Sequence, residues 1–164
     1  FVEKNREITM QVKEIMNKNV ITVTRSTTLR ELLTKFTSFH KFPVVPVIDE
    51  ERKLIGMVFL RNIIDVFSVV KPHISKAIAF YEEEEEDIFN IQLDEGAGSL
   101  ILVDDIMDTK YFYLHEDTTI EEAYKDMKMY QKDELPVVDK EGRLAGIVGI
   151  FDIILAVFRQ NKII

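Results

Sequence analysis

Few residues in this sequence are arranged for catalysis. The three histidines, His40, His73 and His115, lie far apart, and no two of them have metal-ligand spacing. The sequence contains no cysteine, no Gly-x-Ser-x-Gly segment and no His-Glu-x-x-His segment, so the usual nucleophiles and zinc ligands are missing. Carboxylates are too frequent in so acidic a chain to indicate an acid–base pair. We therefore expect no enzyme activity, no metal site and no cofactor.

Two other segments are similar in composition to ion-binding sequences. Residues 82–87 are consecutive glutamates followed by an aspartate, and hard cations such as Mg²⁺ bind several carboxylate oxygens. Such a run more often forms a solvated helix face or a frayed loop. Residues 96–98, Gly-Ala-Gly, lack the Gly-Lys-Ser/Thr that completes a phosphate-binding loop. We interpret them as a turn.

Composition limits the classes of partner. The 164 residues fit one domain or two small ones. With 21 Lys+Arg against 29 Asp+Glu, the net charge is −8, and no basic stripe favours nucleic acid. The longest apolar runs fall far short of the roughly 20 residues of a membrane helix, so we expect no membrane insertion. The absence of cysteine fits a reducing, cytoplasmic location, and the start at Phe1 fits a fragment or a trimmed chain.

The sequence contains an internal duplication. Residues 12–17, Val-Lys-Glu-Ile-Met-Asn, match residues 103–108, Val-Asp-Asp-Ile-Met-Asp, at an offset of 91. Further along, residues 46–49, Pro-Val-Ile-Asp, match residues 136–139, Pro-Val-Val-Asp, at an offset of 90. The same motifs in the same order indicate two copies of one structural unit.

Each copy predicts the same order of elements. Thr28 with Glu31, and Thr119 with Glu122, have the spacing of a capping box at a helix start. Apolar residues at helical spacing follow each cap, and apolar runs of strand length follow each helix. The unit is therefore β-α-β-β-α. The predicted strands are residues 20–24, 44–48 and 54–60 in the first copy and 111–114, 135–138 and 144–150 in the second, and the closing helices are residues 62–70 and 152–160.

These elements divide the chain into three parts. Residues 1–67 form the first repeat with an N-terminal extension, residues 68–102 an acidic linker that is partly helical over 72–87, and residues 103–164 the second repeat. A unit of about 60 residues is marginally stable alone. We therefore expect an α+β fold in which two tandem units cover each other's sheets about a pseudo-two-fold axis, and a homodimer formed through the remaining apolar surface.

The repeated motifs resemble the CBS domain. They are Ile-Met near the start of each copy, Pro-Val-Val-Asp before a turn, and Gly-Ile-Val-x-x-x-Asp-Ile at residues 146–153. Two copies are similar to a CBS pair, or Bateman module, and the resemblance covers roughly residues 12–67 and 103–160. It implies two units that face each other, two clefts between them that often bind adenosine-containing ligands, dimerisation into a disc, and a regulatory role.

The resemblance places the stronger ligand site beside Asp152. In the family, an aspartate at the end of the third strand binds the ribose hydroxyls; this position is Asp152 in the second copy and Asn62 in the first. Asp152 also has the residue type and position to cap the closing helix. The family's nearby threonine or serine, often a phosphate contact, is Gly149 in one copy and Phe59 in the other. Both departures weaken a phosphate site, and Phe59 would crowd its cleft.

The resemblance also implies that the opposite wall of each cleft comes from the other copy. The residues expected to face Asp152 are Val20, Ile21, Thr22, His40, Lys41, Phe42, Pro43 and Val44. Among these, His40 and Lys41 are the expected phosphate partners. The sequence leaves open whether Pro43 or Pro46 corresponds to Pro136.

The second, weaker cleft would contain Asn62 and Phe59. The residues expected to face them are Tyr111, Phe112 and the segment 132–135, which ends at Leu135. Asp133 and Glu134 in that segment would repel a phosphate by up to about 1 kcal/mol each. We expect this cleft to be empty or to take only an uncharged ligand.

Three functional hypotheses follow. The first is a regulatory module that senses an adenosine-containing ligand; the net charge of −8 disfavours ATP and favours AMP, a neutral adenosyl compound or S-adenosylmethionine. The second is a homodimerisation module that binds no small molecule and self-associates through its closing helices. The third is a divalent-cation-responsive cytosolic domain of a transporter that uses residues 82–87.

Overall fold

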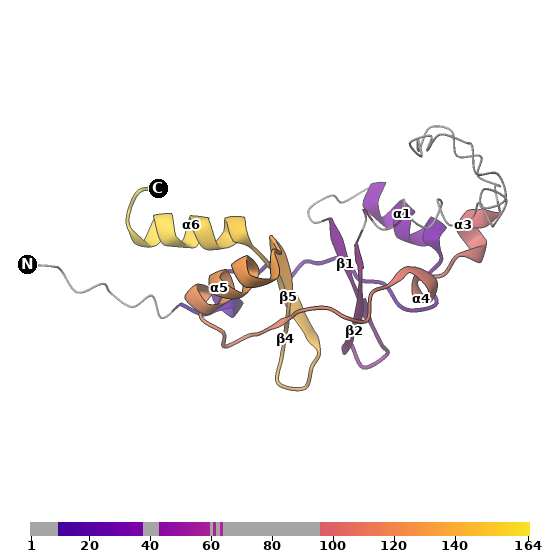
Figure 1. The fold of residues 1–164 in the computed structure, drawn as a ribbon, viewed down its shortest axis with the longest axis horizontal. Coiled ribbons are helices and arrows are strands. Elements are labelled where there is room, and N and C mark those ends of the chain that lie inside the picture. The colour runs from indigo at the N-terminus through magenta and orange to yellow at the C-terminus, as the bar shows by residue number, and fades with distance from the viewer. Residues whose placement is uncertain (1–9, 38–42, 60, 62, 64–95) are drawn as a thin grey trace, which may run out of the picture.

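The computed structural model of the chain describes residues 10–37, 43–59, 61, 63 and 96–164. Two similar units lie side by side along the long axis of the molecule (Figure 1). In chain order the elements are η1 (Val12–Glu14), α1 (Leu29–Thr37), β1 (Val44–Ile48), β2 (Leu54–Phe59), α3 (Ala97–Leu100), α4 (Val103–Ile106), β3 (Leu114–His115), α5 (Ile120–Tyr130), β4 (Glu134–Val138), β5 (Leu144–Gly149) and α6 (Ile150–Gln160).

Each unit is built on an antiparallel hairpin, β1–β2 in the first unit and β4–β5 in the second. Most residues of these strands are buried on both faces, as their continuous apolar runs predict. A further chain segment runs parallel to each hairpin. β3 lies beside β4, and Val23 makes a single parallel bridge to Val47. The predicted α+β fold of two tandem units is confirmed.

The strand register decides which proline of the first repeat corresponds to Pro136. In β1, Pro46 lies opposite Met57, and in β4, Pro136 lies opposite Ile147. Both pairs are related by the same offset of 90 residues. Pro46 is therefore the counterpart of Pro136, and Pro43 corresponds to Asp133.

Helices α1 and α5 begin at the predicted capping boxes. The Thr28 amide donates to Glu31 Oε2 at 2.8 Å, and the Glu31 amide donates to Thr28 Oγ1 at 3.2 Å. Thr119 and Glu122 repeat these bonds at 3.0 and 3.2 Å. The backbone amide and then the hydroxyl of each threonine lower the pKa of Glu31 and of Glu122, because they bind the ionised carboxylate. The caps fix where each helix begins and so which side chains meet the sheet.

The opening segments of the two repeats are exchanged between the units. η1 belongs to the first repeat in sequence, yet the Val12 amide donates to the Thr118 carbonyl at 2.9 Å and the Val12 side chain is buried in the core of the second unit. α4 opens the second repeat, yet the Val103 amide donates to the Thr27 carbonyl at 2.8 Å and its side chain is buried in the core of the first unit. Each unit therefore needs both repeats to complete its core.

Two glycines permit this exchange. Asn17 and Ile147 exchange backbone hydrogen bonds of 2.8 and 3.0 Å, which brings the opening segment against β5. A Cβ on Gly146 would lie 2.6 Å from the Asn17 carbonyl oxygen, and a Cβ on Gly56 would lie 2.9 Å from Met107 Sδ. Only glycine fits these close approaches without a shift of the neighbouring atoms.

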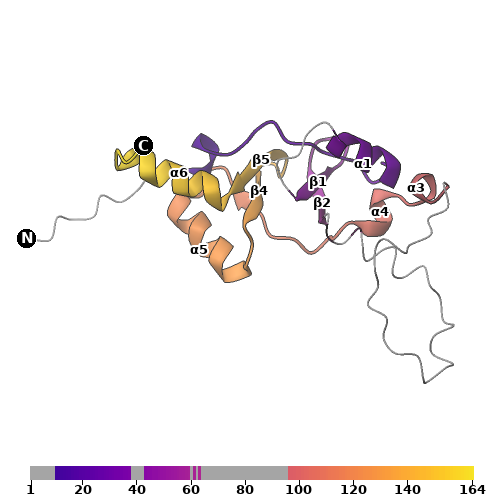
Figure 2. The same ribbon diagram turned by 90° about the horizontal axis from the view of Figure 1, so that it is seen from above.

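A shared apolar core joins the units. It contains buried hairpin residues of both, namely Val44, Ile48, Leu54 and Met57 from the first and Val138, Leu144 and Ile147 from the second. The hairpin turns also pair across the interface: the Leu54 amide donates to the Gly142 carbonyl at 3.0 Å, and the Leu144 amide donates to the Arg52 carbonyl at 2.9 Å. In Figure 2 the two hairpins lie next to each other in the middle of the molecule, with α6 and α1 at opposite ends.

Some predicted segments lie outside the described residues. These are the helix over 72–87, the acidic run 82–87, and all but Ile63 of the closing helix over 62–70. The division of the chain into residues 1–67, 68–102 and 103–164 stays a prediction.

Candidate functional site

Asp152 lies in the first turn of α6, at the end of β5. Its Oδ2 accepts a hydrogen bond from the Gly149 amide at 2.8 Å, so one carboxylate oxygen caps the helix, as predicted from its position. The side chain is half-buried, and among the described residues nothing donates a hydrogen bond to its second oxygen. A Cβ on Gly149 would lie 3.4 Å from Oδ2. Gly149 therefore leaves room around the carboxylate.

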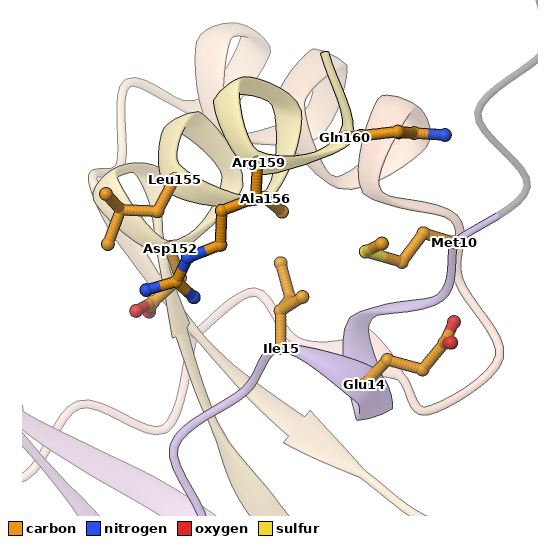
Figure 3. Close-up of a pocket in the computed structure, with 8 residues that line it drawn as sticks. All are labelled: Met10, Glu14, Ile15, Asp152, Leu155, Ala156, Arg159 and Gln160. Carbon is orange, nitrogen blue, oxygen red and sulfur yellow. The ribbon is translucent and has the colours of Figure 1, made fainter. Parts of the chain in front are cut away.

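The Asp152 carboxylate borders a hollow of about 600 Å³ between η1 and α6, named here the Asp152 hollow. Figure 3 shows apolar side chains in its middle, Glu14 and Gln160 at one end, and the guanidinium of Arg159 extending toward Asp152 at the other. Its lining residues are Met10, Glu14, Ile15, Asp152, Leu155, Ala156, Arg159 and Gln160. This volume falls in the range of about 300–1,000 Å³ typical of small-molecule pockets. Because η1 is exchanged, both repeats form the wall.

The predicted opposite wall of the Asp152 site lies elsewhere. Val20 packs against the shared core between the units, and Ile21 packs against the core of the first unit. The Thr22 carbonyl accepts a hydrogen bond from Lys35 Nζ at 3.5 Å. None of these three residues lines the Asp152 hollow, because the opening segment runs antiparallel along β5 and its residues before Asn17 cover that side.

Residues 40–44 divide between the described and undescribed parts of the chain. His40, Lys41 and Phe42 lie outside the described residues, so their place in a ligand site stays a prediction. Pro43 and Val44 do not border Asp152; they line a space between the units together with Phe59. The structure therefore does not bring these two residues to Asp152.

The predicted second cleft corresponds to a space named here the Phe59 crevice. It consists of two adjoining hollows of about 260 and 60 Å³ that share Phe59, Lys132 and Glu134. The smaller hollow is also lined by Tyr111, Phe112 and Leu135. The structure thus brings together four of the five residues predicted for this cleft, and the fifth, Asn62, lies outside the described residues.

Ring and ammonium groups make contacts along the walls of the Phe59 crevice. The Lys132 ammonium lies 5.0 Å from the centre of the Phe59 ring, a cation–π contact. Phe112 stacks on Tyr130 with ring centres 3.6 Å apart and planes inclined by 13°. The Tyr111 hydroxyl donates to the Leu54 carbonyl at 2.8 Å, and burial raises its pKa. These contacts take up part of the crevice, whose two hollows keep about 260 and 60 Å³. That Phe59 crowds the cleft against a ligand stays a prediction.

The charges in the Phe59 crevice are mixed. Asp133 and Glu134 lie where the sequence predicts a wall that repels phosphate, but Arg61, Lys110 and Lys132 line the same space. Burial, and then the neighbouring Asp133 carboxylate, raise the pKa of Glu134. The predicted repulsion is therefore partly offset by these cations. Lys132 belongs to the predicted segment 132–135, whereas Arg61 and Lys110 were not predicted.

The sequence argument also missed Arg159, Glu14 and Gln160 as lining residues of the Asp152 hollow. Arg159 follows Asp152 by seven residues, which places both on one face of a helix. That spacing was visible in the sequence. No sequence signal indicated Glu14, because it reaches the second unit only through the exchange of opening segments.

Helices α5 and α6 present an apolar groove of about 440 Å³ on the outer surface of the second unit. Its lining residues are Ile120, Glu121, Tyr124, Ile153, Ile154, Val157 and Phe158. Tyr124 and Phe158 are each 40% exposed, and Phe151 nearby on α6 is 66% exposed. Large apolar side chains gathered on one face in this way are typical of interaction surfaces.

Comparison with known families decides what this architecture is. Residues 12–69 and 103–159 match the family model of the CBS domain. The chain belongs to the CBS domain family. The two matched segments correspond to the two repeats, so the molecule is a tandem CBS pair. Within the described part of this CBS pair, every helix is too short or too polar to span a bilayer.

The CBS pair is similar to part of several curated proteins. It is 29% identical over 164 residues to inosine-5'-monophosphate dehydrogenase of Aquifex aeolicus, an alignment that covers 94% of this chain and 28% of that protein. It is 31% identical over 140 residues to homoserine O-acetyltransferase of Methanosarcina acetivorans, covering 84% of this chain and 20% of that protein. The chain thus spans less than a third of the length of either relative.

Solved structures share the fold. CBSX2 in complex with AMP aligns with a TM-score of 0.68 at 21% identity, over 93% of this chain and 98% of that one. The CBS domain pair of protein MJ0100, in complex with 5'-methylthioadenosine and S-adenosyl-L-methionine, has a TM-score of 0.65 at 23% identity, over 93% and 98%. The cytosolic domain of the Mg²⁺ channel MgtE in complex with ATP has a TM-score of 0.64 at 26% identity, over 90% and 48%.

Proposed function

We propose that this CBS pair is a regulatory module that binds an adenosine-containing ligand in the Asp152 hollow. The observation that carries the proposal is the half-buried Asp152 carboxylate, with one oxygen open, at the wall of a hollow of about 600 Å³. A carboxylate is a suitable acceptor for the two hydroxyls of a ribose. The apolar side chains of Met10, Ile15 and Ala156 offer surface for the base.

The neighbouring structures support this class of ligand. CBS pairs of the same fold were crystallised with AMP, with 5'-methylthioadenosine and S-adenosyl-L-methionine, and with ATP. The net charge of this chain is −8, which opposes the binding of a triphosphate. AMP, a neutral adenosyl compound and S-adenosylmethionine are therefore the preferred candidates, ahead of ATP.

The exchanged opening segment suggests how a ligand would regulate. A molecule in the Asp152 hollow contacts η1, which belongs to the first repeat, and α6, which belongs to the second. It would therefore stabilise the exchanged arrangement over one in which η1 has moved away. A ligand shifts such an equilibrium only by its difference in affinity for the two states. We propose that the resulting shift between the two states is the regulatory signal passed to the protein that the CBS pair controls.

Calorimetry with AMP, 5'-methylthioadenosine, S-adenosylmethionine and ATP tests the proposal. At least one should bind, and Asp152→Asn should weaken it about tenfold, because hydrogen bonds to a charged acceptor contribute about 1.5–3 kcal/mol. Asp105→Asn is the matched control, because Asp105 Oδ2 accepts the Leu102 amide at 2.9 Å at the start of α4. Equal weakening by both variants, or no binding by any of the four compounds at millimolar concentration, would contradict the proposal.

We also propose that the CBS pair forms a homodimer through the groove of α5 and α6. Its exposed Tyr124 and Phe158 support this assignment, since burial of apolar surface drives association. Phe158→Asp should convert the dimer to a monomer in light scattering, while Lys162→Asp, at the end of the same segment, should not. A wild-type monomer at high protein concentration would contradict the proposal.

A cation-responsive role in a transporter is the second candidate. It is favoured by the likeness to the cytosolic domain of MgtE and by 46% identity over 52 residues to the magnesium transporter MgtE of Thermus thermophilus. That likeness also supports a cytoplasmic location. The described residues contain no group of three or more potential metal ligands, and residues 82–87 lie outside them. A magnesium titration followed by small-angle scattering would reveal compaction if this hypothesis is correct.

A further inference from the structure

The guanidinium of Arg159 lies in the Asp152 hollow without a partner among the described residues. Its side chain extends back along α6 toward Asp152 (Figure 3), as long side chains on helices generally do. The ion pairs within the described part of the chain do not include one between these two residues. A cation and an open carboxylate oxygen therefore lie at the same end of the hollow, each available to a ligand.

We propose that Arg159 is a specificity residue that binds one anionic group on the 5' side of a nucleoside whose ribose hydroxyls bind Asp152. This inference rests on the proposed function of the Asp152 hollow. The group that Arg159 binds is a single anion, either the phosphate of a nucleoside monophosphate or the carboxylate of an adenosyl amino acid. Guanidinium binds both through paired N–H donors.

The charges in the hollow limit the ligand to one such group. Asp152 and Glu14 bring two carboxylates, and Arg159 brings one cation. A second or third phosphate would have no cation from the described lining residues and would approach carboxylates, which like-charge repulsion disfavours. The hollow therefore selects against adenosine triphosphate through its own side chains, in addition to the effect of net charge.

A purely structural role for Arg159 predicts a different geometry. A basic residue in the last turn of a helix can stabilise the helix dipole when its charge lies near the terminal carbonyls. Arg159 is in the last turn of α6, but its guanidinium is directed the other way, toward the beginning of the helix (Figure 3). The charge therefore lies away from the terminal carbonyls, and in this position Arg159 does not stabilise the helix dipole.

Calorimetry on the full chain with four adenosine-containing compounds tests this inference. AMP should bind about tenfold tighter than adenosine if phosphate is recognised, and S-adenosylhomocysteine about tenfold tighter than 5'-methylthioadenosine if carboxylate is recognised. Arg159→Gln should remove that preference and leave adenosine and 5'-methylthioadenosine within about twofold of wild type. The matched control is Arg25→Gln, which removes the same charge from an exposed residue paired with Asp104 in the first unit. Thermal melting of both variants checks their folding.

Each other outcome is decisive. If charged and neutral nucleosides bind equally, or if Arg159→Gln and Arg25→Gln weaken AMP to the same extent, the role of Arg159 is wrong and the proposed function stands. If none of the four compounds binds at millimolar concentration, the proposed function fails and this inference fails with it. A preference for ATP over AMP would also overturn the charge argument.

Discussion

The Asp152 hollow and the Phe59 crevice show how two copies of one unit came to differ. Gly149 ends β5 beside the first, and Phe59 ends β2 beside the second, at positions related by the repeat offset of 90. Where glycine stands, a carboxylate borders about 600 Å³ of open space. Where phenylalanine stands, the ammonium of Lys132 lies over its ring, and the two adjoining hollows measure about 260 and 60 Å³. The scaffold is shared, and the side chain at the end of the strand is one difference between a single large hollow and two smaller ones.

The strongest test of the shared scaffold compares the two close-packed glycines. Gly146→Ala should lower the free energy of unfolding by about 2–3 kcal/mol, because its Cβ meets the backbone oxygen of Asn17, and overpacking of this kind costs about 1–3 kcal/mol. Gly56→Ala should cost less, about 1 kcal/mol, because the atom it meets is the Sδ of the flexible Met107. Urea denaturation measures both. A larger loss from Gly56→Ala than from Gly146→Ala would contradict this prediction.

The difference between the two sites predicts the stoichiometry of ligand binding. Wild type should bind one adenosine-type ligand per chain, because the Phe59 ring divides the crevice into two smaller hollows of about 260 and 60 Å³. Phe59→Ala removes the ring beneath Lys132 and should add a second site. Its affinity should be about tenfold lower, because the crevice has mixed charges and lacks a carboxylate equivalent to Asp152. Calorimetry gives both the number of sites and the affinity of each. Two equal sites in wild type would remove the basis of the comparison.

The helix caps should respond alike in the two repeats. Thr28→Ala and Thr119→Ala each remove the hydroxyl that accepts the Glu31 or Glu122 amide, and loss of an N-cap costs about 1 kcal/mol. The lowered pKa of each glutamate means that its contribution is present above the ordinary value of 4.5 and is lost as the pH falls through the folded pKa. Urea midpoints at neutral and acidic pH measure this. Effects that differ more than twofold between the repeats would contradict equivalent scaffolds.

The smallest expected effect is that of Glu134 in the Phe59 crevice. Burial raises its pKa, so the folded chain binds the proton more tightly and stability falls as the pH rises through the folded pKa. At neutral pH the ionised carboxylate is unfavourable, and Glu134→Gln should raise the urea midpoint slightly. The gain should vanish near about pH 4, where the carboxyl is protonated. Glu50→Gln on the exposed turn is the control, and a lower midpoint for Glu134→Gln would contradict the prediction.

Local sequence signals were sufficient to predict the two hairpins and the two capped helices, whereas the strand predicted over 20–24 is only a bridge at Val23 and the one predicted over 111–114 is Leu114–His115. The capping threonines and glutamates lie three residues apart, and the apolar runs of β1 and β5 are continuous in sequence, so short-range rules find them. The internal duplication was sufficient to predict that the chain folds into two similar units. The predicted bounds of the strands that form the two hairpins differ from the observed ones by a residue at most.

The surroundings of Asp152 could not be predicted in the same way. Its neighbours Met10 and Glu14 come from the other repeat through an exchange that leaves no mark in either motif, since the motif Val-x-x-Ile-Met occurs in both copies whichever unit it completes. By contrast, the resemblance placed the segment 132–135 opposite Phe59, and Lys132 lies 5.0 Å from the centre of that ring. Arg159 is the exception, because helical spacing from Asp152 was sufficient to place it.

The exchange of opening segments has a consequence for fragments of the chain. Val12 completes the core of one unit and Val103 that of the other, so neither half of the sequence carries a whole hydrophobic core. A proteolytic nick between residues 63 and 96 would leave two pieces that remain bound to each other, as in a fragment complementation system. Expressed separately, each piece would lack the segment that seals its interior and would recover its structure only when mixed with the other.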